Sequence, residues 1–153
     1  MITTEIKKRF YRQYSTYIRI AKVLLALFLF SIGGFIYLVY RIDSLEMFHW
    51  VDAVGLDSCV NYLRTKVGSK DLCDWVKFSL PDGLWLISYM FIIDCIWNGC
   101  RSNSFYVFVF GLPFFAILSE IFQYYSLLPG VFDVIDLACY ILAITLYFII
   151  KIS

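Results

Sequence analysis

Five polar side chains stand out in a chain that is otherwise strongly apolar: Asp82, Glu120, Gln123, Asp133 and Asp136. Carboxylate and amide oxygens of this kind are ligands for hard divalent cations such as Mg²⁺. Crowded carboxyl groups can also perform acid–base work, because they do not all ionise at the same pH. We call these five residues the polar cluster and take them as a candidate ligand-binding site. The sequence assigns no catalytic residue and no resident metal.

The composition indicates that lipid is part of the solvent of this protein. Its 153 residues are 61% hydrophobic and 16% charged, whereas an ordinary soluble domain is roughly 45–50% apolar and about 25% charged. A soluble domain of this length could not hide so much apolar surface. The net charge of +1 gives no indication of nucleic-acid binding. We therefore expect a single integral membrane domain; no cofactor motif is evident, although the polar cluster would accept a divalent cation.

Four apolar runs predict an all-α fold, a bundle of four transmembrane helices. About 20 residues cross the hydrocarbon, and the four predicted spans cover residues 23–40, 81–97, 105–125 and 134–150. Residues 41–80 are mixed in character, with apolar residues at roughly helical spacing. They predict one or two amphipathic helices outside the membrane, interrupted at Gly55 and by a turn at 68–71. Gly33 and Gly34 are expected where another helix approaches the first span closely.

The basic N-terminal segment predicts the orientation. Residues 1–22 carry six lysines or arginines and one glutamate, and the positive-inside rule places such a segment in the cytoplasm. Four crossings then bring the C-terminus to the same side and put the polar cluster at the opposite, outer face. On the inner side, Asp94 lies near the end of the second span, where we expect it to pair with Arg101.

Two cysteines lie in the predicted outer segment. An oxidising compartment would allow a disulfide between Cys59 and Cys73. The alternative, in which all five cysteines are buried small hydrophobic residues, is equally compatible with the sequence.

The polar cluster is arranged around one turn. Glu120 and Gln123 lie three residues apart at the end of the third span, and Asp133 and Asp136 lie three apart at the start of the fourth, so each pair shares a helix face. A proline and a glycine between the pairs predict a turn. We therefore expect antiparallel neighbouring helices that bring the two pairs together, with Asp82 entering the same layer.

Two of these acids also have ordinary structural explanations. An aspartate just before an apolar helix, such as Asp133, is a normal N-cap, and Asp136 in the first turn favours the positive helix end. Glu120 has no such explanation, because it lies near a helix C-terminus, where the dipole disfavours an anion.

The pattern in "SEIFQ" (119–123) and "PGVFDVIDL" (129–137) resembles the VanZ-like membrane proteins. Their motif is Glu-x-x-Gln at the end of one membrane helix, a turn, and Asp-x-x-Asp at the start of the next. The entry "SLPDGLW" (79–85) is similar to an earlier helix start of the family, and the resemblance covers residues 79–150. Family members often carry an arginine after the turn glycine, where this chain has Val131.

This resemblance implies an envelope-related role in the bacterial inner (plasma) membrane. The orientation predicted from the basic N-terminal segment places both termini of this multi-pass protein in the cytoplasm. Its polar cluster would bind the headgroup of a membrane lipid or a cation. The alternative is a small membrane subunit or effector that assembles with protein partners or as a homo-oligomer, without catalysis. A transporter or channel is a third class, but no span shows the repeated polar stripe suited to a pore.

Overall fold

The computed structural model describes residues 2–41, 46–68 and 72–152, and this part of the chain is helical with short connections. Four of its helices contain a segment long and apolar enough to cross a membrane: Thr16–Tyr40, Leu80–Trp97, Asn103–Tyr124 and Val134–Lys151. The predicted all-α fold with four candidate spans and short extramembrane helices is confirmed, and the protein is a multi-pass membrane protein. The helices are α1 (Ile2–Tyr40), α2 (Glu46–Ala53), α3 (Asp57–Val67), α4 (Asp74–Phe78), α5 (Leu80–Trp97), α6 (Asn103–Tyr124) and α7 (Val134–Ile152).

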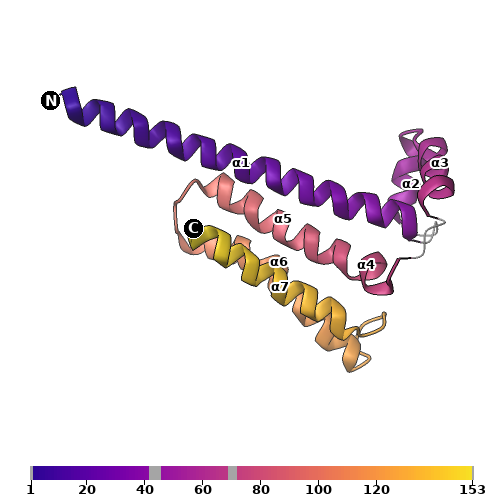
Figure 1. Ribbon diagram of the computed structural model, residues 1–153. Coiled ribbons are helices and arrows are strands. Elements are labelled where there is room, and N and C mark those ends of the chain that lie inside the picture. Colours follow the sequence, from indigo (N-terminus) through magenta and orange to yellow (C-terminus); the bar gives the residue numbers. More distant parts are fainter. Residues whose placement is uncertain (1, 42–45, 69–71, 153) are drawn as a thin grey trace.

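The four long helices alternate in direction (Figure 1). Both chain termini and the α5–α6 connection lie at one end of the bundle, which we call the terminal end. Helices α2, α3 and α4 and the α6–α7 connection lie at the other end, which we call the distal end. Because an even number of long helices alternate in direction, both ends of the described chain lie at the same end of the bundle.

Helix α1 is longer than the first span predicted from the sequence. It runs for 39 residues from Ile2 to Tyr40, which is roughly 58 Å at about 1.5 Å per residue and well beyond a hydrocarbon core of about 30 Å. The basic segment 1–22 therefore belongs largely to the same helix as the span 23–40. No glycine or proline occurs before Gly33, and lysine and arginine are good helix formers.

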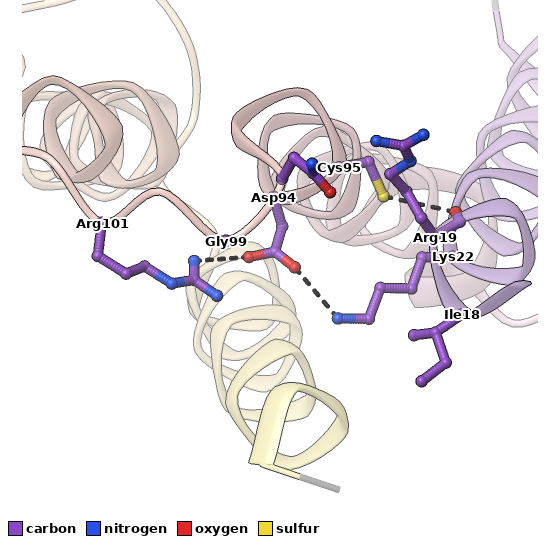
Figure 2. Close-up of a pocket in the computed structure, with 8 residues that line it drawn as sticks. Ile18, Arg19, Lys22, Asp94, Cys95, Gly99 and Arg101 are labelled. Carbon is purple, nitrogen blue, oxygen red and sulfur yellow. Dashed lines mark hydrogen bonds and ion pairs between the residues drawn. The ribbon is translucent and has the colours of Figure 1, made fainter. Parts of the chain in front are cut away.

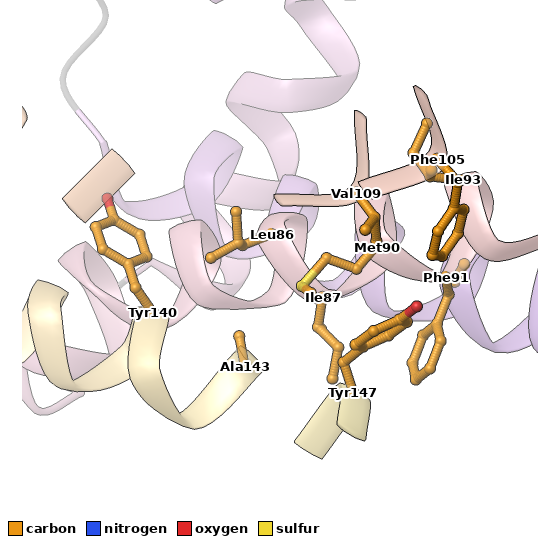
Figure 3. Close-up of a cluster of buried hydrophobic side chains, with 11 residues drawn as sticks. Leu86, Ile87, Met90, Phe91, Ile93, Phe105, Val109, Tyr140, Ala143 and Tyr147 are labelled. Carbon is orange, nitrogen blue, oxygen red and sulfur yellow. The ribbon is translucent and has the colours of Figure 1, made fainter. Parts of the chain in front are cut away.

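Helix α5 is the central helix of the bundle, because α1, α6 and α7 each pack against it. Its candidate span is 56% buried, whereas those of the other three are between 17% and 22% buried. The hydrophobic core forms around it (Figure 3), and the ring centroids of Phe91 and Tyr147 lie 5.8 Å apart there. The core residues are Ala26, Leu86, Ile87, Met90, Phe91, Ile93, Phe105, Val109, Tyr140, Ala143 and Tyr147.

Two glycines allow close helix contacts with α5. A Cβ at Gly33 would lie 2.7 Å from Nε1 of Trp85, whose indole N–H donates a hydrogen bond of 3.2 Å to the carbonyl of Phe30. A Cβ at Gly83 would lie 3.1 Å from the Cβ of Cys139 on α7. The close approach predicted for the glycine pair of α1 is thus confirmed at Gly33, whereas Gly34 faces open space.

Helices α3 and α4 of the distal end pack against α1. Gly55 separates α2 from α3 at a φ of +75°, which confirms the predicted interruption. From α3, Arg64 donates hydrogen bonds to the carbonyls of Leu38 (2.8 Å) and Arg41. The last carbonyls of a helix have no partner within it, so Arg64 stabilises the C-terminus of α1. Of the turn predicted at 68–71, only residue 68 lies within the described residues.

Candidate functional site

The structure brings the five residues of the polar cluster to the distal end of the bundle. Asp82 lies in the first turn of α5 and Asp136 in the first turn of α7. Glu120 and Gln123 lie in the last turns of α6, and Asp133 immediately precedes α7. Asp82, Glu120 and Asp136 are close enough to repel one another electrostatically. The antiparallel arrangement expected for α6 and α7 is therefore present, and Asp82 joins the same layer.

Glu120 connects α6 to α7. Its side chain is buried, with 4% of its surface exposed, and its Oε2 accepts a hydrogen bond of 3.3 Å from the backbone N–H of Asp133. The C-terminus of α6 disfavours an anion, but the N-terminus of α7 favours one. The acceptor position at the start of α7 thus compensates for the unfavourable place of Glu120 on its own helix.

The two aspartates of the Asp-x-x-Asp motif differ in their surroundings. Oδ1 of Asp133 accepts a hydrogen bond of 2.8 Å from the N–H of Ile135, which confirms its predicted role as the N-cap of α7. Asp136 keeps the predicted position in the first turn, but its Oδ1 is buried without a hydrogen-bond partner in the described part of the chain. A helix-start role explains Asp133 fully and leaves one oxygen of Asp136 unexplained.

Arg41 is a neighbour of the cluster that the sequence analysis did not assign. Its Nη2 lies 3.9 Å from Oδ2 of Asp82 and donates a hydrogen bond of 3.0 Å to the carbonyl of Phe78. The guanidinium carbon lies 5.4 Å from the ring centroid of Tyr37 and 5.1 Å from that of Phe78. Val131, which occupies the position of the usual family arginine, is 87% exposed. Within the described residues, the cation beside this cluster therefore comes from the end of α1.

Gln123 lies against the turn between α6 and α7. Gly130 in that turn has a φ of +134°, and a Cβ there would meet Nε2 of Gln123 at 2.7 Å. The glycine is required both by its backbone conformation and by the amide packed on it. Gln123 thus packs against the α6–α7 turn.

The described residues contain no group of three acidic, histidine or cysteine side chains placed to hold a metal ion. The carboxyl groups of the polar cluster lie at one end of the bundle, but their oxygens have different partners. At the same end, Cys59 and Cys73 are exposed. The alternative in which all five cysteines are buried is therefore wrong, and the disulfide between Cys59 and Cys73 stays a prediction.

A second polar cluster occupies the terminal end, around Asp94 (Figure 2). This buried carboxylate, 7% exposed, accepts hydrogen bonds from Arg101 Nη1 at 2.7 Å, from Lys22 Nζ at 3.1 Å and from the Tyr147 hydroxyl at 3.3 Å. The predicted pairing with Arg101 is confirmed. Lys22 and Tyr147 were not foreseen, because they come from α1 and α7.

The contacts of Asp94 keep Arg101 charged. Burial opposes the charged form of the guanidinium and is the largest single effect. The hydrogen bond and the negative charge of Asp94, together with the interaction with Tyr147, outweigh burial, so the pKa of Arg101 lies above its ordinary value. The charge of Asp94 is correspondingly compensated by two cations from different parts of the chain.

The chain matches no protein-family model, no curated protein and no solved structure. Its assignment therefore rests on its own sequence and structure, which establish a multi-pass membrane protein.

Proposed function

We propose that this protein is a VanZ-like component of the bacterial cell envelope, and that its polar cluster binds the zwitterionic headgroup of a membrane lipid. The observation that carries the proposal is the unpartnered, buried Oδ1 of Asp136 in a layer rich in carboxyl groups. The motif around the α6–α7 turn supports the family assignment.

The charge of the cluster favours a cationic group. Four of its five members are acids, and in the part of the chain that the structure describes only Arg41 places a cation against one of them, at 3.9 Å from Asp82. Carboxylates at this density would repel a bare phosphate. A primary ammonium group, with three N–H donors, supplies both the missing charge and a donor for Asp136.

A second unpartnered group favours a phosphate beside that ammonium. Nε of Arg41 is buried and without a hydrogen-bond partner among the described residues, and arginine N–H groups bind phosphate oxygens. Asp82 links the two positions, because it contacts Arg41 and interacts electrostatically with Asp136. A phosphoethanolamine headgroup carries both groups at a spacing of a few atoms. The cluster lies at the ends of three candidate spans, where headgroups are found.

Lipid binding to the purified protein tests the proposal. Delipidated protein in detergent is titrated with phosphatidylethanolamine or phosphatidylcholine, and bound lipid is counted by native mass spectrometry. We expect phosphatidylethanolamine to bind more tightly, because the quaternary ammonium of phosphatidylcholine has no N–H donor. Asp136→Asn should weaken phosphatidylethanolamine binding by about tenfold, the loss expected for a charge-assisted hydrogen bond.

Asp52→Asn is the matched control, because Asp52 is exposed on α2 and loses the same charge at the same end of the bundle. Equal binding by the Asp136→Asn and Asp52→Asn variants would overturn the headgroup site.

The proposed orientation has a separate test with native thiols. Cys100 lies exposed at the terminal end and Cys73 exposed at the distal end. In cells, a variant that retains only Cys73 should react with an impermeant maleimide from outside, and one that retains only Cys100 should not. The reverse result would place the polar cluster in the cytoplasm and refute an outer-face site.

A further inference from the structure

The terminal end contains a cavity with excess positive charge. Its volume is about 170 Å³, and its charged lining consists of Arg19, Lys22, Arg101 and Asp94 (Figure 2). Three cations against one carboxylate leave a net charge of +2. Lys151 lies within electrostatic range of Lys22 and Arg101 and adds to this field. The cavity therefore attracts an anion, although one carboxylate also lines it.

The cations retain donors that Asp94 does not use. Lys22 has three N–H donors and Arg101 has five, and each gives one hydrogen bond to Asp94. The guanidinium carbon of Arg101 lies 4.4 Å from the ring centroid of Phe105, which holds it in place. For the side chain of Arg19, no acidic partner occurs among the described residues. A phosphate in the cavity would find free donors without breaking the existing ion pairs.

An apolar groove of about 410 Å³ adjoins the cavity between α1 and α5. Arg19 and Cys95 line both spaces, so the groove begins where the cavity ends. Its remaining lining is aliphatic, with Leu24 and Leu27 on α1 facing Ile96 and other residues of α5. Leu27 lies eight positions after Arg19, which is roughly 12 Å along the helix axis at about 1.5 Å per residue. The groove thus extends from the level of the charges into the span.

The geometry points to a binding site for an anionic phospholipid, with the phosphate in the cavity of Arg19, Lys22 and Arg101 and an acyl chain in the adjoining α1–α5 groove. Basic pockets between transmembrane helices recognise anionic headgroups in this way. A free phosphate would use only the cavity, and a zwitterionic lipid would bring an ammonium group into a cationic site. This site is separate from the polar cluster, which lies at the opposite end of the bundle.

A substitution at Arg19 tests lipid binding without disturbing the ion pairs of Asp94. Lys22 and Arg101 hold Asp94, so their replacement would perturb the fold as well as the site. Arg19 is exposed and contributes to neither ion pair. Arg19→Gln therefore removes a charge from the cavity and leaves the contacts of Asp94 in place. Lys66→Gln, at an exposed position of α3 at the distal end, is the matched control with the same change in charge.

The test measures lipid binding to delipidated full-length protein in detergent by native mass spectrometry. We expect phosphatidylglycerol to bind more tightly than phosphatidylcholine, and Arg19→Gln to weaken phosphatidylglycerol roughly five- to tenfold, while Lys66→Gln leaves it unchanged. Raising the salt concentration should weaken the binding of phosphatidylglycerol to the wild type. Equal binding by the Arg19→Gln and Lys66→Gln variants would overturn the site.

Two further arms identify the source of the anion. Leu24→Trp fills the groove and should weaken phosphatidylglycerol, while thermal unfolding confirms that this variant folds. Glycerol phosphate, which has no acyl chain, should fail to displace the lipid at millimolar concentration. Efficient displacement by glycerol phosphate, or unchanged lipid binding by a folded Leu24→Trp variant, would show a small-anion site and refute the lipid.

Discussion

Replacing Asp94 by asparagine should destabilise the bundle, because this one carboxylate joins three helices and a connection. Its oxygens accept hydrogen bonds from Lys22 on α1, from Arg101 before α6 and from Tyr147 on α7. Asparagine has nearly the same shape but no charge, and its amide nitrogen cannot accept a hydrogen bond. The variant therefore removes the charge-assisted interactions without creating a cavity.

The size of the effect follows from the burial of the partners. Breaking a fully buried ion pair costs about 3–5 kcal/mol. Here the side chain of Lys22 is 20% exposed and that of Arg101 is 34% exposed, so both cations regain water when Asp94 is neutralised. The asparagine oxygen also retains one hydrogen bond. We expect a loss of about 2 kcal/mol in the free energy of unfolding, which corresponds to roughly 4–8 °C in Tm for a protein of this size.

Thermal unfolding in detergent, followed by tryptophan fluorescence, measures this loss, and Asp52→Asn is the control. The exposed Asp52 should change the free energy of unfolding by less than about 0.5 kcal/mol. A double-mutant cycle with Arg101→Gln should give a coupling of about 1 kcal/mol. The reasoning is refuted if Asp94→Asn matches the control, or if the effects of the two substitutions simply add.

Two further predictions concern helix contacts. Gly33→Ala should leave the protein at least about 1 kcal/mol less stable than Gly34→Ala in the same assay. A Cβ at position 33 would lie 2.7 Å from Trp85, whereas a Cβ at position 34 meets nothing within 4 Å. Equal stabilities of the two variants would contradict the close α1–α5 contact. Glu120→Ala should lower the free energy of unfolding by about 1–3 kcal/mol, because it leaves the N–H of Asp133 without its acceptor. Glu120→Gln keeps an acceptor oxygen and should lower it by less than about 1 kcal/mol. Equal losses would show that the charge, and not the hydrogen bond, stabilises the start of α7.

The membrane class and the four spans could be predicted from the sequence because both depend on local composition. An apolar run of about 20 residues satisfies its backbone hydrogen bonds within one helix, whatever its neighbours are. The same holds for the N-cap formed by Asp133 and for the interruption at Gly55, since each depends on the residue itself and its immediate neighbours. The helix α1 begins well before the span predicted over residues 23–40, because lysine and arginine continue the helix outside the apolar run.

The partners of the polar groups could be predicted only where the two residues are close in sequence. Arg101 is seven residues from Asp94, so this pairing was expected. Lys22 is 72 residues from Asp94 and Tyr147 is 53 residues away, and no local pattern indicates such partners. Arg41 and Asp82 likewise lie at opposite ends of the mixed segment 41–80, so no local pattern indicates their contact.

The sequence by itself therefore determined that this is a four-span membrane protein with acids around the α6–α7 turn and bases near the N-terminus. The tertiary structure alone determined which charged side chains contact one another across helices. The physical reason is that the rotation of each helix about its axis depends on contacts with other helices, such as that of Gly33 with Trp85. That rotation turns Lys22 toward Asp94, brings Glu120 to the start of α7 and leaves an oxygen of Asp136 buried without a partner among the described residues.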